Sequence, residues 1–160
     1  MRRPGRPIRA AALAVVALSA GLTAQGPQLA GSWTIDRAAG SAGRGIAGIP
    51  LPTTLVIKVS TGDVTMEADT GSGQATQTFV YKLDGSTNAV PGALGWETRA
   101  TASWDGGRLV VMTRRSMTGP TGPMSVDVKD VYSVAGDVLT IDRSMGRVAQ
   151  KLVYRKGAAR

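Results

Sequence analysis

The sequence predicts an all-β protein that folds as a single up-and-down antiparallel β-barrel of eight to nine strands. From Leu29 onward, apolar residues tend to alternate with polar ones, and no segment has a helical period. Glycine-containing turn sequences interrupt this alternation at short intervals. Of the 160 residues, about 135 follow a removable N-terminal segment, which is enough for one domain with its own core.

The first 24 residues are predicted to be a signal peptide. A basic stretch, MRRPGRP, precedes the apolar stretch IRAAALAVVALSAGL and the small, polar TAQG. Cleavage is expected after Ala24, with Gly21 as the alternative site. The mature domain would then span 25–160 and be periplasmic or secreted. We expect no membrane-spanning helix, because the apolar stretch is short and no later one approaches about 20 residues.

The composition excludes several kinds of active site. The chain has no histidine and no cysteine, so Ser-His-Asp and Cys-His catalysis and the usual zinc ligands are absent. Most carboxylates lie in or beside predicted turns, where aspartate is a common turn former. We therefore predict no metal, no cofactor and no enzymatic activity. Without disulfides in an exported protein, stability must come from packing.

The positive charge is partly a property of the signal peptide. The formal net charge is +8, and removal of Arg2, Arg3, Arg6 and Arg9 lowers it to about +4. The remaining basic residues are scattered, whereas a nucleic-acid footprint needs them clustered on one face. We therefore expect no nucleic-acid partner.

Nine strands are predicted, and the connections between them determine the topology. They lie at 29–36, 55–60, 63–69, 74–82, 96–104, 108–116, 124–134, 137–143 and 147–156. Most of the breaks are short, as in STGD, WDGG and AGD, so each strand pairs with its successor in a meander. Closing the meander into a barrel removes its edges. A two-sheet sandwich is the alternative, but it needs more long connections than the one present here.

That long connection, at 37–54, is glycine-rich and contains Ile46, Ile49 and Leu51. It has two interpretations. It could lie across the end of the barrel and cover the core, or it could form a lid over the mouth of a cavity, because long loops in compact domains are often functional.

Several motifs resemble a known family. Gly31-Ser32-Trp33 lies in the first strand, and Arg155 lies in LVYRKG near the C-terminus. With YKLDGSTNAVPG, ATASWDGGRLVV and DVYSVAGDVLTID, they resemble the exported bacterial lipocalin-like (calycin-type) proteins of unknown function. The resemblance covers nearly all of the mature chain.

The resemblance implies a structural role for Gly31, Trp33 and Arg155. In lipocalins the tryptophan plugs the closed end of the barrel, and a late arginine lies across its ring. A guanidinium over a buried indole would join the first and last strands. Unlike typical lipocalins, this chain lacks the disulfide of the C-terminal segment and a helix after the last strand.

The strand at 124–134 carries the most informative polar residue. Alternation places Asp130 with Val128 and Tyr132 on the apolar, inward face. A buried carboxylate needs a partner. Arg114 would supply it if the preceding hairpin has the right register, and Arg99 if its strand faces the other way. This Asp130 is either part of a structural ion pair, solvated near the barrel mouth, or a polar anchor for a ligand.

The ligand-binding candidates are residues expected to face the interior. They are Asp130, Arg114, Tyr132, Gln77, Phe79, Tyr81, Thr98 and Gln150. The predicted function is non-covalent binding of a small apolar or amphipathic molecule. The alternative is a protein-interaction or inhibitor-type barrel with a filled interior, which would bind a protein partner through the loop at 37–54.

Overall fold

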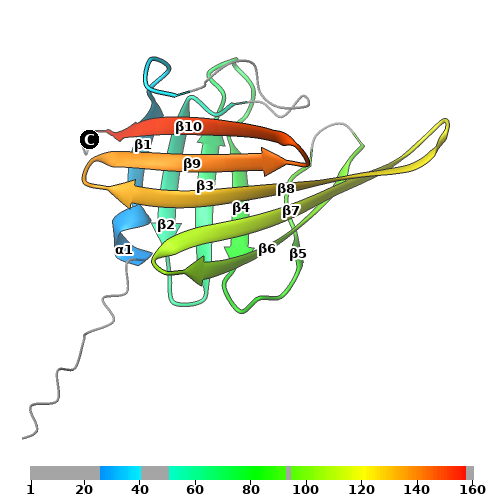
Figure 1. The fold of residues 1–160 in the computed structure, drawn as a ribbon, viewed down its shortest axis with the longest axis horizontal. Coiled ribbons are helices and arrows are strands. Elements are labelled where there is room, and N and C mark those ends of the chain that lie inside the picture. Colours follow the sequence, from blue (N-terminus) through cyan, green and yellow to red (C-terminus); the bar gives the residue numbers. More distant parts are fainter. Residues whose placement is uncertain (1–25, 41–50, 93–94, 158–160) are drawn as a thin grey trace, which may run out of the picture.

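The chain forms one antiparallel sheet that curls into a nearly closed barrel (Figure 1). A computed structural model describes residues 26–40, 51–92 and 95–157. The predicted signal peptide and most of the long loop, 41–50, lie outside the described residues. Export therefore remains a prediction. The single sheet confirms the barrel and excludes the sandwich.

The strands follow the chain as a meander. After a short helix, α1 (Gly26–Leu29), they are β1 (Gly31–Ile35), β2 (Thr54–Val59), β3 (Asp63–Asp69), β4 (Gln77–Lys82), β5 (Asn88–Ala89), β6 (Glu97–Asp105), β7 (Arg108–Gly119), β8 (Gly122–Ala135), β9 (Val138–Met145) and β10 (Val148–Lys156). Their order in the sheet is β4-β3-β2-β1-β10-β9-β8-β7-β6-β5. No helix among these residues is long and apolar enough to cross a membrane.

Two tight turns fix the register of β8, β9 and β10. Gly136 and Gly146 have φ values of 59° and 57°, in the left-handed region that glycine adopts readily. Each turn joins directly paired strand ends, Ala135 to Val138 and Met145 to Val148. The side chains of these strands therefore alternate between core and solvent as the sequence predicted, except at Val153, which is buried although both of its neighbours in β10 are buried too.

The one strand of the described chain that the sequence analysis did not predict, β5, lies at the seam of the barrel. The sequence reads as a turn around Asn88, but Asn88 and Ala89 pair with Ala100 and Arg99 of β6. The Asn88 side chain also donates a hydrogen bond to the backbone carbonyl of Val80 on β4, at 2.7 Å. A side chain thus bridges the two edges of the sheet at this point, where no ladder joins them.

The first and last strands meet, but the cation over the tryptophan is not the predicted one. Trp33 is fully buried, and its indole nitrogen donates to the carbonyl of Leu29 at 3.0 Å. In the ladder Trp33 lies opposite Lys156, whose ammonium is 5.6 Å from the ring centroid. The prediction for Arg155 is wrong, because it lies opposite Thr34 and instead binds Asp36 at 3.0 Å on the outside. Gly31, with φ of 143°, begins the strand.

We predict that Trp33→Ala lowers the free energy of unfolding by about 3–5 kcal/mol, because it removes a large, fully buried side chain from the core. Arg155→Ala is the control, and it should change stability by less than about 1 kcal/mol, since its ion pair is exposed. Urea denaturation measures both variants. An equal loss in the two variants would contradict this assignment.

Candidate functional site

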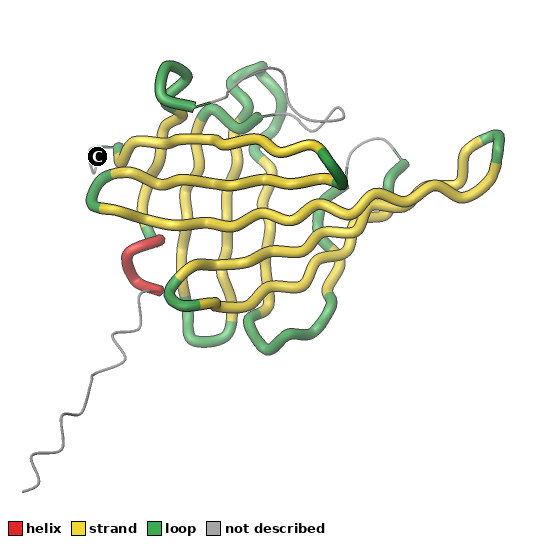
Figure 2. The backbone as a smooth tube through the Cα atoms, in the orientation of Figure 1, coloured by secondary structure: helices red, strands yellow, loops and turns green. Residues whose placement is uncertain are grey.

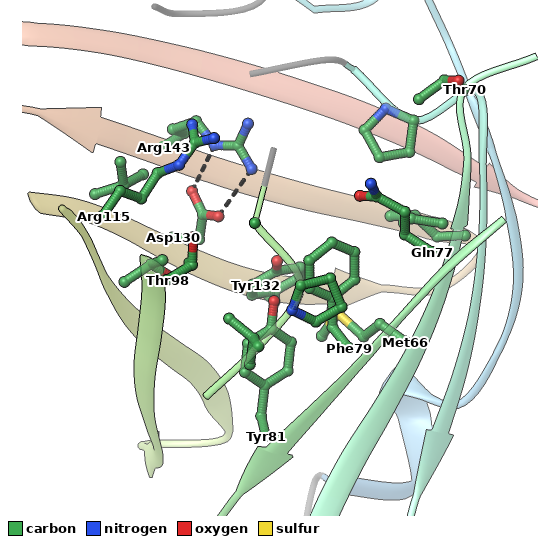
Figure 3. Close-up of a pocket in the computed structure, with 18 of the residues that line it drawn as sticks. Met66, Thr70, Gln77, Phe79, Tyr81, Thr98, Arg115, Asp130, Tyr132 and Arg143 are labelled. Atoms are coloured by element: carbon green, nitrogen blue, oxygen red, sulfur yellow. Dashed lines mark hydrogen bonds and ion pairs between the residues drawn. The ribbon is translucent and has the colours of Figure 1, made fainter. Parts of the chain in front are cut away.

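The barrel encloses a cavity of about 490 Å³ (Figure 3). Strands β2, β3 and β4 contribute mainly apolar side chains to its wall, and β6 to β9 contribute most of its charged and polar ones. The lining residues are Pro52, Leu55, Met66, Ala68, Thr70, Gln74, Gln77, Phe79, Tyr81, Val90, Pro91, Gly92, Thr98, Thr113, Arg115, Val128, Asp130, Tyr132 and Arg143. The interior is therefore hollow and has two chemically different sides.

A buried ion pair occupies the polar side. Asp130 on β8 and Arg143 on β9 lie directly opposite each other in the ladder. The guanidinium donates Nε to one carboxylate oxygen at 2.7 Å and Nη2 to the other at 2.9 Å. Their side chains are only 9% and 10% exposed, respectively. This bidentate geometry satisfies both oxygens of the inward carboxylate.

The ion pair holds the Arg143 guanidinium in its charged state. Burial by itself lowers the pKa of Arg143, but the hydrogen bonds that Arg143 donates to Asp130 and the negative charge of Asp130 outweigh burial. The pKa of the guanidinium therefore lies above its usual value, and Arg143 stays protonated. Its charge is balanced locally by Asp130.

Neither predicted arginine partners Asp130. Arg114 lies opposite Asp127 in the ladder and binds it on the outer face, at 2.8 and 2.9 Å. The β7–β8 register pairs even-numbered residues of one strand with odd-numbered residues of the other, so Asp130 shares its face with Val111. Arg99 also lies outside, in an exposed ion pair with Glu97. Both predictions are wrong because they depended on register, which turn sequences alone did not determine.

Most other predicted residues do line the cavity. Asp130, Tyr132, Gln77, Phe79, Tyr81 and Thr98 are all in its wall. Gln150 is buried on β10 opposite Arg143, but it is not among the lining residues. Phe79 and Tyr81 stack with their ring planes 5° apart and their centroids 6.2 Å apart. They form an aromatic wall next to Met66 (Figure 3).

Two arginines of the site were missed by the sequence analysis. Arg143 follows Leu139 and Ile141 at alternate positions, and both of these are buried. Arg115 likewise follows Leu109, Val111 and Thr113 on the inner face of β7. Continuing the apolar alternation to the end of each strand would have found both, because the face of a side chain depends on position and not on polarity.

Arg115 is the second cation of the cavity and, unlike Arg143, it has no carboxylate partner among the described residues. Its guanidinium lies 5.5 Å from the centroid of the Trp96 ring. Within the described part of the chain it forms no ion pair. Burial and the nearby positive charge of Arg143 lower the pKa of Arg115 from its usual value. An arginine remains protonated at neutral pH in spite of such effects, so an anion beside it would be stabilised.

Two further polar atoms in this wall have no hydrogen-bond partner among the described residues. They are Nη1 of Arg143 and Oγ1 of Thr98, and both are buried. Thr98 is 6% exposed. A Cβ built on Gly92 would collide with the Trp96 carbonyl and with Oγ1 of Thr98, so the loop backbone passes close to this hydroxyl. Unpaired buried donors are costly and are typical of positions that a ligand completes.

The three tyrosines of the chain are all buried. Burial, reinforced by the negative charge of Asp130, raises the pKa of Tyr81 and of Tyr132 well above the usual value. Burial also raises the pKa of Tyr154 to about 12, and the hydroxyl of Tyr154 donates to the carbonyl of Pro52 at 3.0 Å. The cavity therefore holds neutral phenols at neutral pH.

Comparison with known structures confirms the fold. No family model and no curated protein matches the sequence. A secretory abundant heat soluble protein from Ramazzottius varieornatus is 18% identical, with TM-score 0.63, covering 81% of this chain and 95% of that one. The REP1-NXSQ fatty acid transporter is 16% identical, with TM-score 0.61, covering 84% and 99%. Lipid binding protein 8 of Caenorhabditis elegans is 11% identical, with TM-score 0.56, covering 82% and 96%.

These similarities define the fold of the protein. The chain is an all-β, nearly closed antiparallel barrel with calycin-like structural neighbours. At such low identity they show the fold alone. What the cavity binds must be argued from its own residues.

We predict that the tyrosines of the folded protein do not ionise as the pH rises through about 10. Their folded-state pKa values exceed the unfolded value, so this contribution to stability is present below about pH 10 and is lost as the pH rises towards about 12. Ultraviolet absorbance of tyrosinate measures the titration. The guanidinium-unfolded chain, as control, should titrate near pH 10, and the same midpoint in the folded protein would refute the buried placement.

Proposed function

We propose that this protein binds a small amphipathic molecule with one acidic group, non-covalently, inside the barrel. The observation that carries the proposal is the cavity of about 490 Å³, in which an apolar wall faces the buried guanidinium of Arg143 and the partly buried guanidinium of Arg115. Small-molecule sites are typically of this size and combine a mainly apolar lining with a few convergent polar groups.

The charges of the cavity favour a single negative charge on the ligand. The charged residues in the described lining are Arg115, Asp130 and Arg143. Asp130 balances Arg143, so Arg115 leaves one uncompensated positive charge. An acidic group beside Arg115 could also accept hydrogen bonds from the unpaired Nη1 of Arg143 and Oγ1 of Thr98. Such charge-assisted hydrogen bonds are stronger than neutral ones.

The opposite side of the cavity fits the apolar part of the molecule. Leu55, Met66, Ala68 and Phe79 line it. Removing the apolar part from water supplies binding free energy in proportion to the area buried. Met66 is flexible and can adjust to different shapes, so the apolar side favours a class of ligands over one particular compound.

The structural neighbours support a lipid-like ligand. Their names describe a fatty acid transporter and a lipid binding protein. Such molecules carry an acidic group on an apolar body, which is the combination that the cavity walls favour. With the predicted signal peptide at 1–24 in support, we further propose that the protein acts in the periplasm or outside the cell.

The alternative function depended on a filled interior. That expectation is wrong, because the barrel is hollow. A protein partner for the loop at 37–54 stays untested, and residues 41–50 of this loop lie outside the described residues. No observation favours this alternative over ligand binding.

We predict that the protein binds decanoate more tightly than decanol, and that Arg115→Gln removes this preference. Loss of the charge-assisted contact should weaken decanoate binding about tenfold or more, with little effect on decanol. Isothermal titration calorimetry measures both ligands. The matched control is Arg114→Gln, since Arg114 lies next in sequence but on the outer face. Equal affinities in the wild type, or equal losses in the two variants, would refute the proposal.

A further inference from the structure

The β7–β8 hairpin extends well beyond the barrel wall. The last pair between β6 and β7 joins Glu97 to Ser116, and the last pair between β8 and β9 joins Lys129 to Ser144. Beyond these pairs, β7 and β8 continue together as far as Gly119 and Gly122 with no third strand beside them in the described chain. Figures 1 and 2 show this two-stranded ribbon projecting away from the body of the protein.

The ribbon has one apolar and one polar face. Met117 lies directly opposite Met124, and alternation places Val126 on the same face. This face continues the cavity wall, because Arg115 and Val128 line the cavity immediately before it. The other face pairs Ser116 with Ser125 and Thr118 with Pro123. The ribbon is therefore amphipathic, with its apolar side continuous with the inside of the barrel.

The apolar face is only partly covered, because the ribbon has no core of its own and Met117 and Val126 are half-buried. Met124 is 46% exposed. An isolated two-stranded ribbon is at best marginally stable in water, and it is expected to gain from burying this face against a partner. The single exposed methionine of the barrel wall, Met112, is 43% exposed but lies on the outer face of β7, opposite Lys129.

The distribution of charge favours a lipid surface as the partner. No residue from 116 to 126 is charged. The cation at the base of the apolar face, Arg115, forms no ion pair among the described residues. Asp127, the first carboxylate after the ribbon in the sequence, is on the other face and is held by Arg114. A cation followed by an uncharged apolar tip matches the order of head groups and acyl chains in a bilayer.

The backbone of the tip argues against pairing with another strand. Pro120 and Pro123 have no amide hydrogen, and prolines on an exposed edge oppose the addition of a further strand. A second copy of this chain is therefore a less suitable partner for the ribbon than a surface that needs no directed hydrogen bonds.

We propose that the β7–β8 hairpin docks on a lipid bilayer through Met117, Met124 and Val126, with Arg115 at the level of anionic head groups. Docking brings the end of the cavity that holds Arg115 to the membrane, so an amphipathic molecule passes between the two along one apolar face. The path of the ligand rests on the proposed function, whereas docking itself does not.

Vesicle flotation of the whole mature protein tests this proposal. The protein should bind mixed vesicles made of equal parts phosphatidylcholine and phosphatidylglycerol. It should bind vesicles of phosphatidylcholine alone more weakly, because they lack anionic head groups. The double variant Met117→Ser/Met124→Ser should lose about tenfold in vesicle affinity. The control, Met112→Ser, removes a similarly exposed methionine from the outer face and should bind as the wild type does.

Three results would overturn docking: no vesicle binding by the wild type, undiminished binding by the double variant, or an equal loss in Met112→Ser. A change of oligomeric state in the double variant, seen by size-exclusion chromatography, would also overturn it and assign the ribbon to a second copy. Decanoate titration of the same variants separates the two proposals. Loss of vesicle binding with intact decanoate binding supports docking, while vesicle binding without any decanoate binding refutes only the proposed function.

Discussion

The buried ion pair between Asp130 and Arg143 is the constraint on which the interior of this barrel depends. An unpaired carboxylate at this position would be strongly unfavourable, and the bidentate contact removes that cost by joining β8 to β9. The pair makes one side of the cavity polar. It adds no net charge, because the two opposite charges cancel. The positive charge available to a ligand therefore comes from Arg115, on the neighbouring strand.

The pairing of the other strands explains the shape of the molecule. The first and last strands close the sheet around Trp33, and the two remaining edges approach each other where Asn88 bonds to Val80. β7 and β8 are the longest strands of the described chain. They extend beyond β6 and β9 at the end of the barrel where Arg115 lines the cavity. Cavity, charged wall and projecting ribbon are thus parts of one continuous surface, as the proposed uptake of an amphipathic molecule from a lipid layer requires.

Alternation and turn chemistry were sufficient to predict the meander, the barrel and six residues of the cavity wall, including Asp130. They were not sufficient for contacts that depend on register. A shift of one residue exchanges Arg114 for Arg115 on the inner face, and replaces Arg155 by Lys156 over Trp33. The proline-glycine sequence at the tip of the long hairpin predicted a break, yet both strands continue into it, because prolines are tolerated on a ribbon without further neighbours.

The most direct test of the buried ion pair is the free energy of unfolding of three variants: Arg143→Met, Asp130→Leu and the double variant. Arg143→Met leaves a buried carboxylate without its partner and should cost about 3–5 kcal/mol, whereas the double variant should recover most of that loss, because both charges are gone. Urea denaturation, with circular dichroism to confirm the fold, gives all three values. A double variant as unstable as the sum of the two single variants would show that the groups are not coupled, and would contradict a buried pair at the centre of the cavity wall.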